Sequence, residues 1–272
     1  ATKKITVKIA KATQSITAKI GASSVAVGKT TTVSVTGVKG SKSYKSSDTT
    51  IATVTSAGKV TAKKVGTVKI TATSAATANY NAASKIVTVK VVPAATASIS
   101  TTNQAKGIKL TWKKVTGATG FLVYRGSTKI ATIKSGSTVT YTDSKANTNG
   151  TKYIYKIIPT ALTGNGPAKY VTTYCVARPA ISSVTNSASK RMTVKWGKNA
   201  KASGYQIHYC TDKTFKSGNK SVNIKGAGTV AKAIASLTKG KTYYVRIRTY
   251  KTVGSTKCFS GWSAVKSVKI SK

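Results

Sequence analysis

Residues 44–73 read YKSSDTTIATVTSAGKVTAKKVGTVKITAT and decide the fold of this chain. Apolar and polar residues alternate along three short segments, 50–55, 59–62 and 66–73, which are separated by tight turns. A period of two between such turns is typical of half-buried antiparallel strands with polar outer faces. The same pattern continues downstream, so we predict an all-β chain built from a tandem array of three β-sandwich modules.

The composition agrees with this fold class. The chain of 272 residues has room for two or three domains, and hydrophobic residues make up 40% of it. Thr, Ser, Val and Ile are abundant, which favours β-structure. No heptad or sustained helical period occurs, and lysines interrupt the apolar runs, so we expect no membrane insertion.

The charge of the chain is its most unusual property. Lys and Arg number 46 against 3 acidic residues, all of them Asp, which gives a formal net charge of +43. The basic residues occur singly or in pairs such as Lys63-Lys64, which indicates a diffuse coat and not a basic groove. Such a coat either maintains solubility and protects sheet edges or attracts polyanions. We favour a general, salt-sensitive affinity for anionic surfaces.

The first complete module is expected over residues 11–92. Its pattern comprises Tyr44-x-Ser46-Ser47-Asp48, Ile51-Ala52-x-Val54, Gly58-x-Val60, Gly66 and Ile70-x-Ala72. With these residues the module resembles the bacterial immunoglobulin-like group 2 family. The resemblance implies an extracellular, non-catalytic module of the kind that occurs in tandem.

The first ten residues form a separate segment in this interpretation. The strand-like run at 4–9 and the residues after it match the closing strand, linker and opening strand at 85–99. We interpret residues 1–10 as the closing strand of a preceding Ig-like module. The alternative is that they form an edge strand of the first module.

Two more modules are expected over residues 93–178 and 179–272. The second contains the strand-like segments 110–112 and 120–124, and the third repeats them at 194–196 and 204–209. Both modules resemble fibronectin type III domains. The two linkers, at Pro93 and Pro179, are too short for free rotation, so we expect a semi-rigid rod.

The fibronectin resemblance also implies roles for four aromatic residues. Trp112 and Trp196 are expected in the two cores, and Tyr153 and Tyr243 at the corner between strands E and F. The second module has Asn147 where the third has Leu237, so its corner is expected to be built differently.

A candidate binding strip lies in the third module. Arg246, Arg248 and Tyr250 alternate along one predicted strand, and Trp262 is expected to open the neighbouring strand. The pattern resembles the Trp/Arg ladder of cytokine-receptor fibronectin modules. One interpretation is a ladder that stiffens the sheet; the other is an exposed aromatic and cationic strip that contacts a glycan or a protein. Further aromatic residues could extend it, namely Tyr170, Tyr174 and Phe259.

Catalysis is not expected, and neither are a cofactor and a bound metal. The carboxylates occur once per module, each in a predicted turn, as Asp48, Asp143 and Asp212. General acid-base chemistry and calcium binding both need more groups in one place. The one histidine, His208, is expected to be solvated on an outer face. The cysteines have no metal-ligand spacing and are expected as free thiols, namely Cys175, Cys210 and Cys258.

These observations predict a monomeric, non-catalytic protein that is secreted by or displayed on a Gram-positive bacterium. Its expected partners are anionic cell-wall or host glycans. The alternatives are a secreted ligand that binds one host receptor through the fibronectin modules, and a passive spacer for an upstream domain. Nucleic acid would be bound through charge alone, without readout of the base sequence.

Overall fold

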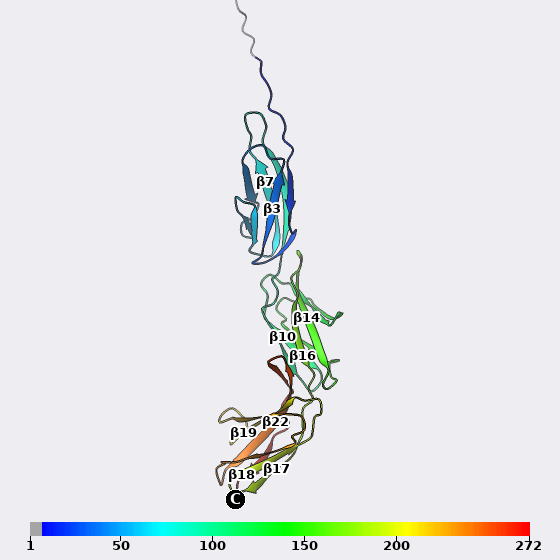
Figure 1. The fold of residues 1–272 in the computed structure, drawn as a ribbon, viewed down its shortest axis with the longest axis vertical. Helices are drawn as coiled ribbons and strands as arrows, with labels where there is room; N and C mark the ends of the chain where they lie inside the picture. Colours follow the sequence, from blue (N-terminus) through cyan, green and yellow to red (C-terminus); the bar gives the residue numbers. More distant parts are fainter. Residues whose placement is uncertain (1–6) are drawn as a thin grey trace, which may run out of the picture.

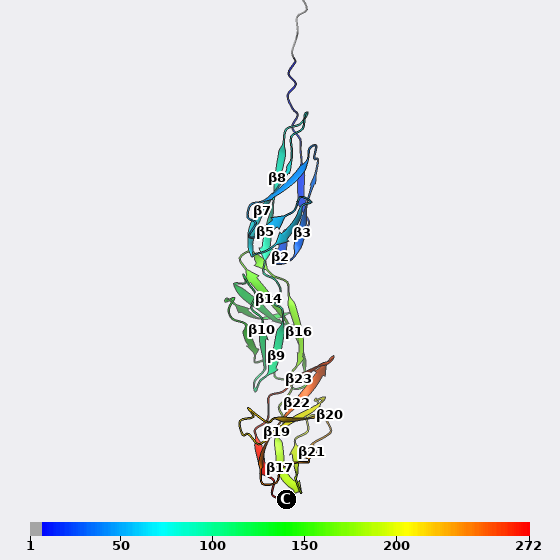
Figure 2. The same ribbon diagram turned by 90° about the vertical axis from the view of Figure 1, so that its left-hand side faces the viewer.

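The computed structural model describes residues 7–272 as three β-sandwiches in succession. No helix occurs within this range, and the prediction of an all-β chain is confirmed. Figures 1 and 2 show that the modules follow one another along one long axis, with the third inclined to the second. The order of the modules in space is therefore their order in the sequence.

The first module packs two four-stranded sheets face to face, in the orders β1-β3-β6-β5 and β2-β8-β7-β4. Strand β2 pairs with β8 in parallel, whereas β3, β6 and β7 pair with their neighbours antiparallel. Side chains of alternating residues, such as Val33, Val60 and Ile70, are buried between the sheets. The strands are β1 (Thr17–Ile20), β2 (Ser24–Ala26), β3 (Thr30–Thr36), β4 (Lys42–Ser46), β5 (Ala52–Val54), β6 (Lys59–Ala62), β7 (Gly66–Ser74) and β8 (Ala83–Val92).

The segment that predicted the fold forms β5, β6 and β7. Strand β6 has the predicted bounds, but β5 is shorter than the predicted segment 50–55. The reason is a turn at Asp48. The backbone N–H of Thr50 donates to Asp48 Oδ1 at 2.8 Å, and that of Ala52 donates to the Asp48 carbonyl oxygen at 3.1 Å. This turn occupies the residues that precede the strand.

The segment before the first module is described only in part. Residues 7–10 form no strand, and the side chains of Val7 and Ile9 are exposed. Residues 7–10 therefore contribute no strand to either interpretation, and the assignment of residues 1–10 stays a prediction. Residues 1–6, which carry most of the predicted strand, lie outside the described range.

The second module pairs a three-stranded sheet, β13-β10-β9, with a five-stranded sheet in which β14 is flanked by β11, β15 and β16 and β12 pairs with β11. Trp112 on one sheet and Phe121 on the other meet in the core, with ring centroids 5.3 Å apart. The strands are β9 (Ile99–Asn103), β10 (Ile108–Trp112), β11 (Gly120–Arg125), β12 (Thr128–Ile133), β13 (Thr140–Asp143), β14 (Lys152–Ala161), β15 (Gly164–Asn165) and β16 (Lys169–Tyr174).

The third module repeats this arrangement, with the sheets β17-β18-β21 and β20-β19-β22-β23 and with β24 paired to β22. Trp196 meets Tyr205 across its core at 5.4 Å between ring centroids. The strands are β17 (Ile181–Ala188), β18 (Arg191–Trp196), β19 (Gly204–Cys210), β20 (Lys220–Lys225), β21 (Ala231–Ile234), β22 (Thr242–Val253), β23 (Thr256–Phe259) and β24 (Lys266–Lys269).

The four aromatic residues assigned from the fibronectin resemblance do not all have the expected positions. Trp112 and Trp196 are buried in their cores, and the Tyr243 hydroxyl accepts the backbone N–H of Thr238 at 3.1 Å. Tyr153 is only partly buried and makes no such bond to any residue that the structure describes. The buried tyrosine of that module is Tyr155, two residues further on. The second module therefore lacks the corner that the third has.

Candidate functional site

The outer face of β22 carries a stack of aromatic and cationic side chains, which we call the Arg–Trp ladder. Arg246 and Arg248 share this face because they are two residues apart in a strand. The Trp262 ring centre lies 4.5 Å from Arg246 Cζ and 4.3 Å from Arg248 Cζ. Phe215 covers the other side of Arg246 at 4.1 Å, and Phe259 covers Arg248 at 3.7 Å. Each guanidinium group thus lies between two aromatic rings.

Trp262 was predicted to open the last strand, and this prediction is wrong. The residue lies in the irregular segment between β23 and β24. Two serines hold this segment on β22. Ser260 and Thr249 exchange bonds, because the Ser260 N–H donates to the Thr249 carbonyl at 2.9 Å and the Thr249 N–H donates to Ser260 Oγ at 3.0 Å. Ser263 and Ile247 repeat the exchange at 2.8 and 3.0 Å. The serine hydroxyls accept the β22 N–H groups that the carbonyls of a neighbouring strand would otherwise accept. The segment is therefore held along β22, with the Trp262 indole over the sheet.

A strained loop positions Phe215 at one end of the ladder. Phe215 has φ of 57°, a left-handed conformation that costs a residue other than glycine about 1–2 kcal/mol. Asp212 stabilises the loop, since its carboxylate accepts the N–H groups of Thr214 at 2.8 Å and Lys216 at 2.9 Å. The Thr214 hydroxyl also donates to Asp212 Oδ1 at 2.7 Å, and this bond, followed by the backbone bonds, holds the pKa of Asp212 at about 2, below its ordinary value. Asp212 is therefore in a turn, as predicted, and the turn supports the ladder.

The two arginines of the ladder differ in their hydrogen bonding. Arg248 donates from Nε and Nη2 to the side-chain oxygen of Gln206 at 2.8 and 2.6 Å. Arg246 Nε is buried and has no partner among residues 7–272. Burial lowers the pKa of both guanidinium groups from the ordinary value, and the charge of Arg246 adds to the effect on Arg248.

His208 is not the solvated histidine that the sequence predicted. It does lie on the outer face of its sheet, but its ring centre is 4.2 Å from that of Trp262. Burial, followed by the charges of Arg246 and Arg248, lowers the pKa of His208 from 6.5 to about 4. The imidazole is thus neutral at physiological pH and belongs to the packing of the ladder.

The prediction that Tyr250 belongs to the exposed binding strip is also wrong. Tyr250 shares the face of the arginines but is only 3% exposed, because its ring crosses the sheet over Gly204. Its hydroxyl donates to the Ile224 carbonyl at 3.3 Å, and Phe259 packs against its ring at 5.8 Å. Arg246, Arg248 and Trp262 are assembled as predicted, but Tyr250 is closed to a ligand.

The sequence did not reveal a buried polar network in the second module. Asp143 is 3% exposed and forms an ion pair with Arg125 Nη1 at 2.9 Å. It also accepts the Tyr155 hydroxyl at 2.9 Å and the Lys145 N–H at 3.2 Å. The sequence contained one indication of this network, because Asp143 shares with Tyr141 the inward-facing side of its strand. Burial and the bond to Asp143 raise the pKa of Tyr155 far above its ordinary value.

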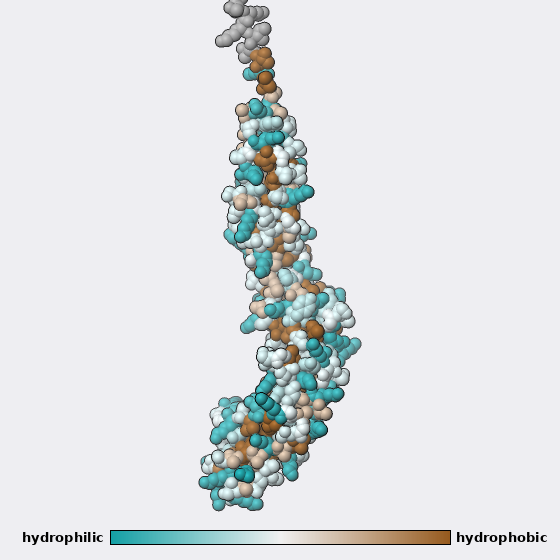
Figure 3. Space-filling view, viewed as in Figure 1, coloured by the Kyte–Doolittle hydropathy of each residue, from teal (hydrophilic) through white to brown (hydrophobic). Residues whose placement is uncertain are grey.

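The lysine coat extends over all three modules. Figure 3 shows hydrophilic side chains along the whole visible face, with small apolar patches between them. The lysines of β6, β12 and β24, for example, are all exposed. Between residues 7 and 272 the Arg125–Asp143 contact is the one salt bridge present. The charge of nearly every lysine is therefore uncompensated by the protein itself.

The second and third modules are joined by buried polar side chains. Asn103 is 6% exposed and donates from Nδ2 to the carbonyls of Tyr174 and Phe259, each at 3.0 Å. On the linker, the Ala177 carbonyl accepts the hydroxyl of Thr249 and an amide N–H of another asparagine, Asn199. The two modules are thus connected by specific bonds as well as by the chain.

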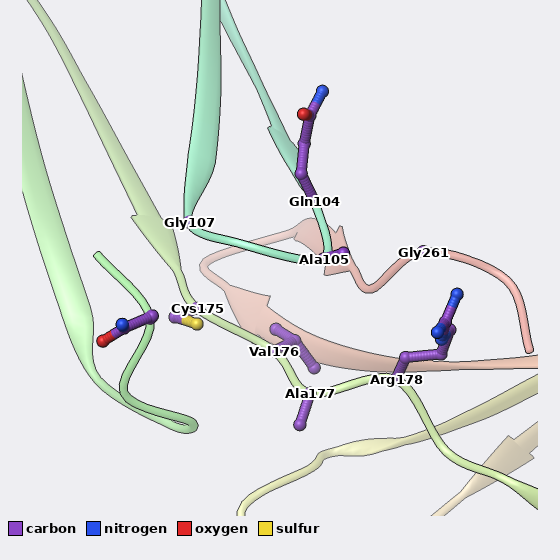
Figure 4. Close-up of a pocket in the computed structure, with 9 residues that line it drawn as sticks. Gln104, Ala105, Gly107, Cys175, Val176, Ala177, Arg178 and Gly261 are labelled. Carbon is purple, nitrogen blue, oxygen red and sulfur yellow. The ribbon is translucent and has the colours of Figure 1, made fainter. Parts of the chain in front are cut away.

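Two of the hollows at this junction lie beside β22 or beside the segment that carries Trp262. One, of about 300 Å3, lies beside the linker, and Figure 4 shows it between the Gln104–Gly107 turn, Gly261 and the Cys175–Arg178 segment. The other, of about 460 Å3, lies between β9, β16 and β23 and has Arg248 in its wall. The Arg–Trp ladder therefore reaches the module junction.

The described residues hold no cluster of three or more metal-ligating side chains. The three cysteines are free thiols as expected, with Cys175 and Cys210 buried and Cys258 partly exposed. Burial raises the pKa of the Cys175 thiol. No helix in the described part of the chain could span a membrane.

The comparison with protein families supports the family resemblance predicted for the first module. Residues 12–86 match the family model described as bacterial Ig-like domain (group 2). Among curated proteins, none matches the chain.

Solved structures with similarity to the chain contain fibronectin type III domains. They include the FN1–FN3 domains of chicken CNTN1, at 13% identity and a TM-score of 0.40 over 95% of this chain and 99% of that one. A two-domain fibronectin type III segment of chicken tenascin matches at 14% identity and a TM-score of 0.30, over 65% of this chain and 99% of that one. A structure described as FN3tt mut has 20% identity and a TM-score of 0.29, over 32% of this chain and 99% of that one. The family match places the bacterial Ig-like domain (group 2) in the first module, at residues 12–86.

Proposed function

We propose that this chain is a non-catalytic, modular protein of the bacterial exterior that associates with anionic polymers through its lysine coat. The observation that carries the proposal is the unpaired charge. The formal net charge is +43, and the described residues contain one salt bridge. Lysine ammonium groups that have no partner within the protein are free to bind phosphate, sulfate or carboxylate groups.

The shape of the molecule favours a polymer over a small anion. Exposed lysines occur on each of the three modules, which extend along one axis (Figure 1). A long polyanion can contact several modules at once, and each lysine contact releases condensed counterions. Such binding is additive over many weak contacts and needs no deep pocket. The polymers of a Gram-positive cell wall and the acidic glycans of a host surface both have this chemistry.

The module types support a location outside the cytoplasm. Bacterial Ig-like domains are typical of extracellular proteins, as are fibronectin type III domains, which the later modules resemble. Tandem modules of these kinds serve as binding modules or as spacers. In this proposal the lysine coat gives the rod its affinity for the surface, and the string of sandwiches gives it reach.

The proposal is tested by removing the charge of the lysines without removing the lysines. Binding to heparin, to polyglycerol phosphate and to neutral dextran is measured before and after acetylation, which neutralises each ammonium group. Guanidination serves as the matched control, because it modifies the same lysines but keeps their charge. Binding that survives guanidination and is lost on acetylation, with the circular dichroism spectrum unchanged, supports the proposal. Binding that survives acetylation contradicts it.

A further inference from the structure

The larger hollow at the junction of the second and third modules has the properties of a ligand site. It has a volume of about 460 Å3 and is open to solvent between β9 and β16 of one module and β23 of the next. Ligand sites are frequently found at such domain interfaces. We call this hollow the junction cleft.

Hydrogen bonds within the second module and between the two modules hold the floor of the junction cleft in place. The Thr101 hydroxyl donates to Thr173 Oγ1 at 2.9 Å, and the Thr173 hydroxyl donates to Cys258 Sγ at 3.5 Å. Thr173 is fully buried. The Asn103 bond to the Phe259 carbonyl closes one end of the same wall. The cleft is therefore part of the joint between the modules.

Arg248 presents a pre-oriented cation to the junction cleft. Its guanidinium is held between Phe259 at 3.7 Å and Trp262 at 4.3 Å, and Gln206 accepts two of its N–H groups. The remaining nitrogen, Nη1, has no acceptor anywhere in residues 7–272. A guanidinium that is already immobilised loses little rotamer entropy when it binds an anion. Lys257 adds a second cation to the wall.

The rest of the junction cleft is lined by threonine and serine residues together with apolar side chains such as Ile99, Val171 and Phe259. Thr102, Thr172 and Thr256 line it, and their side chains have no hydrogen-bond partner within the described residues. No acidic residue is among the described residues that line it. Hydroxyl groups of this kind pair well with the hydroxyl groups of a sugar or polyol. The lining thus combines an anion-binding group with sites for a polyol.

We propose that the junction cleft binds one unit of an anionic saccharide or polyol, with its phosphate, sulfate or carboxylate group at Arg248. The inference rests on the proposed function and deepens it, because it adds a specific contact to an otherwise diffuse coat. A second copy of this chain is a poor occupant, since both surfaces are strongly positive. Glycan and polyol phosphate share the required chemistry and are distinguished by the test.

Cys258 provides a direct reporter, because it lies in the junction cleft and is the partly exposed cysteine of the three. The full chain is alkylated with a maleimide at physiological salt, and labelling of each cysteine is followed by peptide mass spectrometry. The probes are a short heparin oligosaccharide, a glycerol phosphate oligomer and a neutral maltooligosaccharide. At a probe concentration about ten times Kd, only the free fraction reacts and Cys258 labelling slows about tenfold. The buried Cys175 and Cys210 should not change, and the anionic probe that protects Cys258 identifies the ligand type.

The variant Lys257→Glu distinguishes specific binding in the junction cleft from general binding to the lysine coat. It should abolish protection of Cys258, whereas Lys232→Glu, the same charge change at an exposed position of β21 outside the cleft, should leave protection intact. Slow labelling of Cys210 shows that each variant is folded. If the wild-type chain binds an anionic probe while Cys258 stays unprotected, or if both variants lose protection equally, the cleft inference is overturned and the proposed function stands. If the wild-type chain binds neither anionic probe, both fail.

Discussion

Replacing Trp262 with alanine should destabilise the third module, because the indole is the centre of the Arg–Trp ladder. The ring contacts the guanidinium groups of Arg246 and Arg248 and the imidazole of His208. Its loss also uncovers one side of the Arg246 guanidinium, whose Nε has no partner in residues 7–272. The ladder therefore contributes to stability even though it lies on the outer face of the sheet.

The magnitude follows from these contacts. Each cation–π contact in a partly exposed setting is worth about 0.5–1 kcal/mol. Truncation of a fully buried Trp costs about 3–5 kcal/mol, and Trp262 is only partly buried. The expected loss is about 2–4 kcal/mol of the free energy of unfolding of the third module. Trp262→Phe keeps an aromatic face over both arginines and should retain about half of this.

The free cysteines make the assay specific to a module. Cys210 is buried in the third module and Cys175 in the second, so their alkylation rates against urea concentration report the two unfolding reactions separately. Trp262→Ala should shift the Cys210 profile to lower urea and leave the Cys175 profile nearly unchanged. Tyr170→Ala, at an aromatic side chain that is 61% exposed, serves as control and should change either profile by less than about 0.5 kcal/mol. A Trp262→Ala loss below about 0.5 kcal/mol would refute a stabilising ladder.

Three further predictions concern buried polar groups. Asp143→Asn should lower the stability of the second module by about 2–3 kcal/mol, seen in Cys175 labelling, because Arg125 loses its partner but its side chain, 28% exposed, can be partly rehydrated; an unchanged profile would contradict the network. Since the pKa of His208 falls from 6.5 to about 4 on folding, the unfolded third module binds more protons between these values. The free energy of unfolding of the third module should therefore be highest above pH 6.5 and should decrease as the pH falls toward 4. The reaction of Cys210 with a pyridyl disulfide would measure this decrease, and His208→Gln should remove the pH dependence. Asn103→Leu leaves the carbonyls of Tyr174 and Phe259 unpaired at the junction, so small-angle X-ray scattering should show a wider distribution of shapes; an identical curve would mean that these bonds do not fix the joint.

The period of two predicted the fold class and most strand positions because sandwich strands have one buried and one solvated face. Strand β6 was found at its predicted residues, whereas β5 was shortened by the hydrogen bonds of Asp48, which alternation does not reveal. The corner at Tyr243 was predicted, but in the second module the buried hydroxyl is that of Tyr155, which bonds to Asp143. Local pattern does not reveal which of two nearby tyrosines meets a distant carboxylate.

The candidate site was predicted in part for the same reason. Arg246, Arg248 and Trp262 could be brought together by strand phase, because each lies on or beside one face of β22. Tyr250 has the same phase, yet it folds over Gly204 and is buried. The role of Phe215 depends on a left-handed residue in a loop, and the junction cleft depends on how two modules meet. Both are tertiary features that a strand pattern does not contain.

The central claim, that the charge of this chain serves binding to polyanions, is tested most directly by a salt titration. The affinity of the intact chain for heparin and for polyglycerol phosphate is measured from about 0.05 to about 0.2 M salt, where the loss reports the number of cations engaged. Engagement of about four lysines predicts roughly a hundredfold loss over this range, with no binding to neutral dextran. Binding that is absent at low salt, or that is unaffected by salt, would contradict the claim.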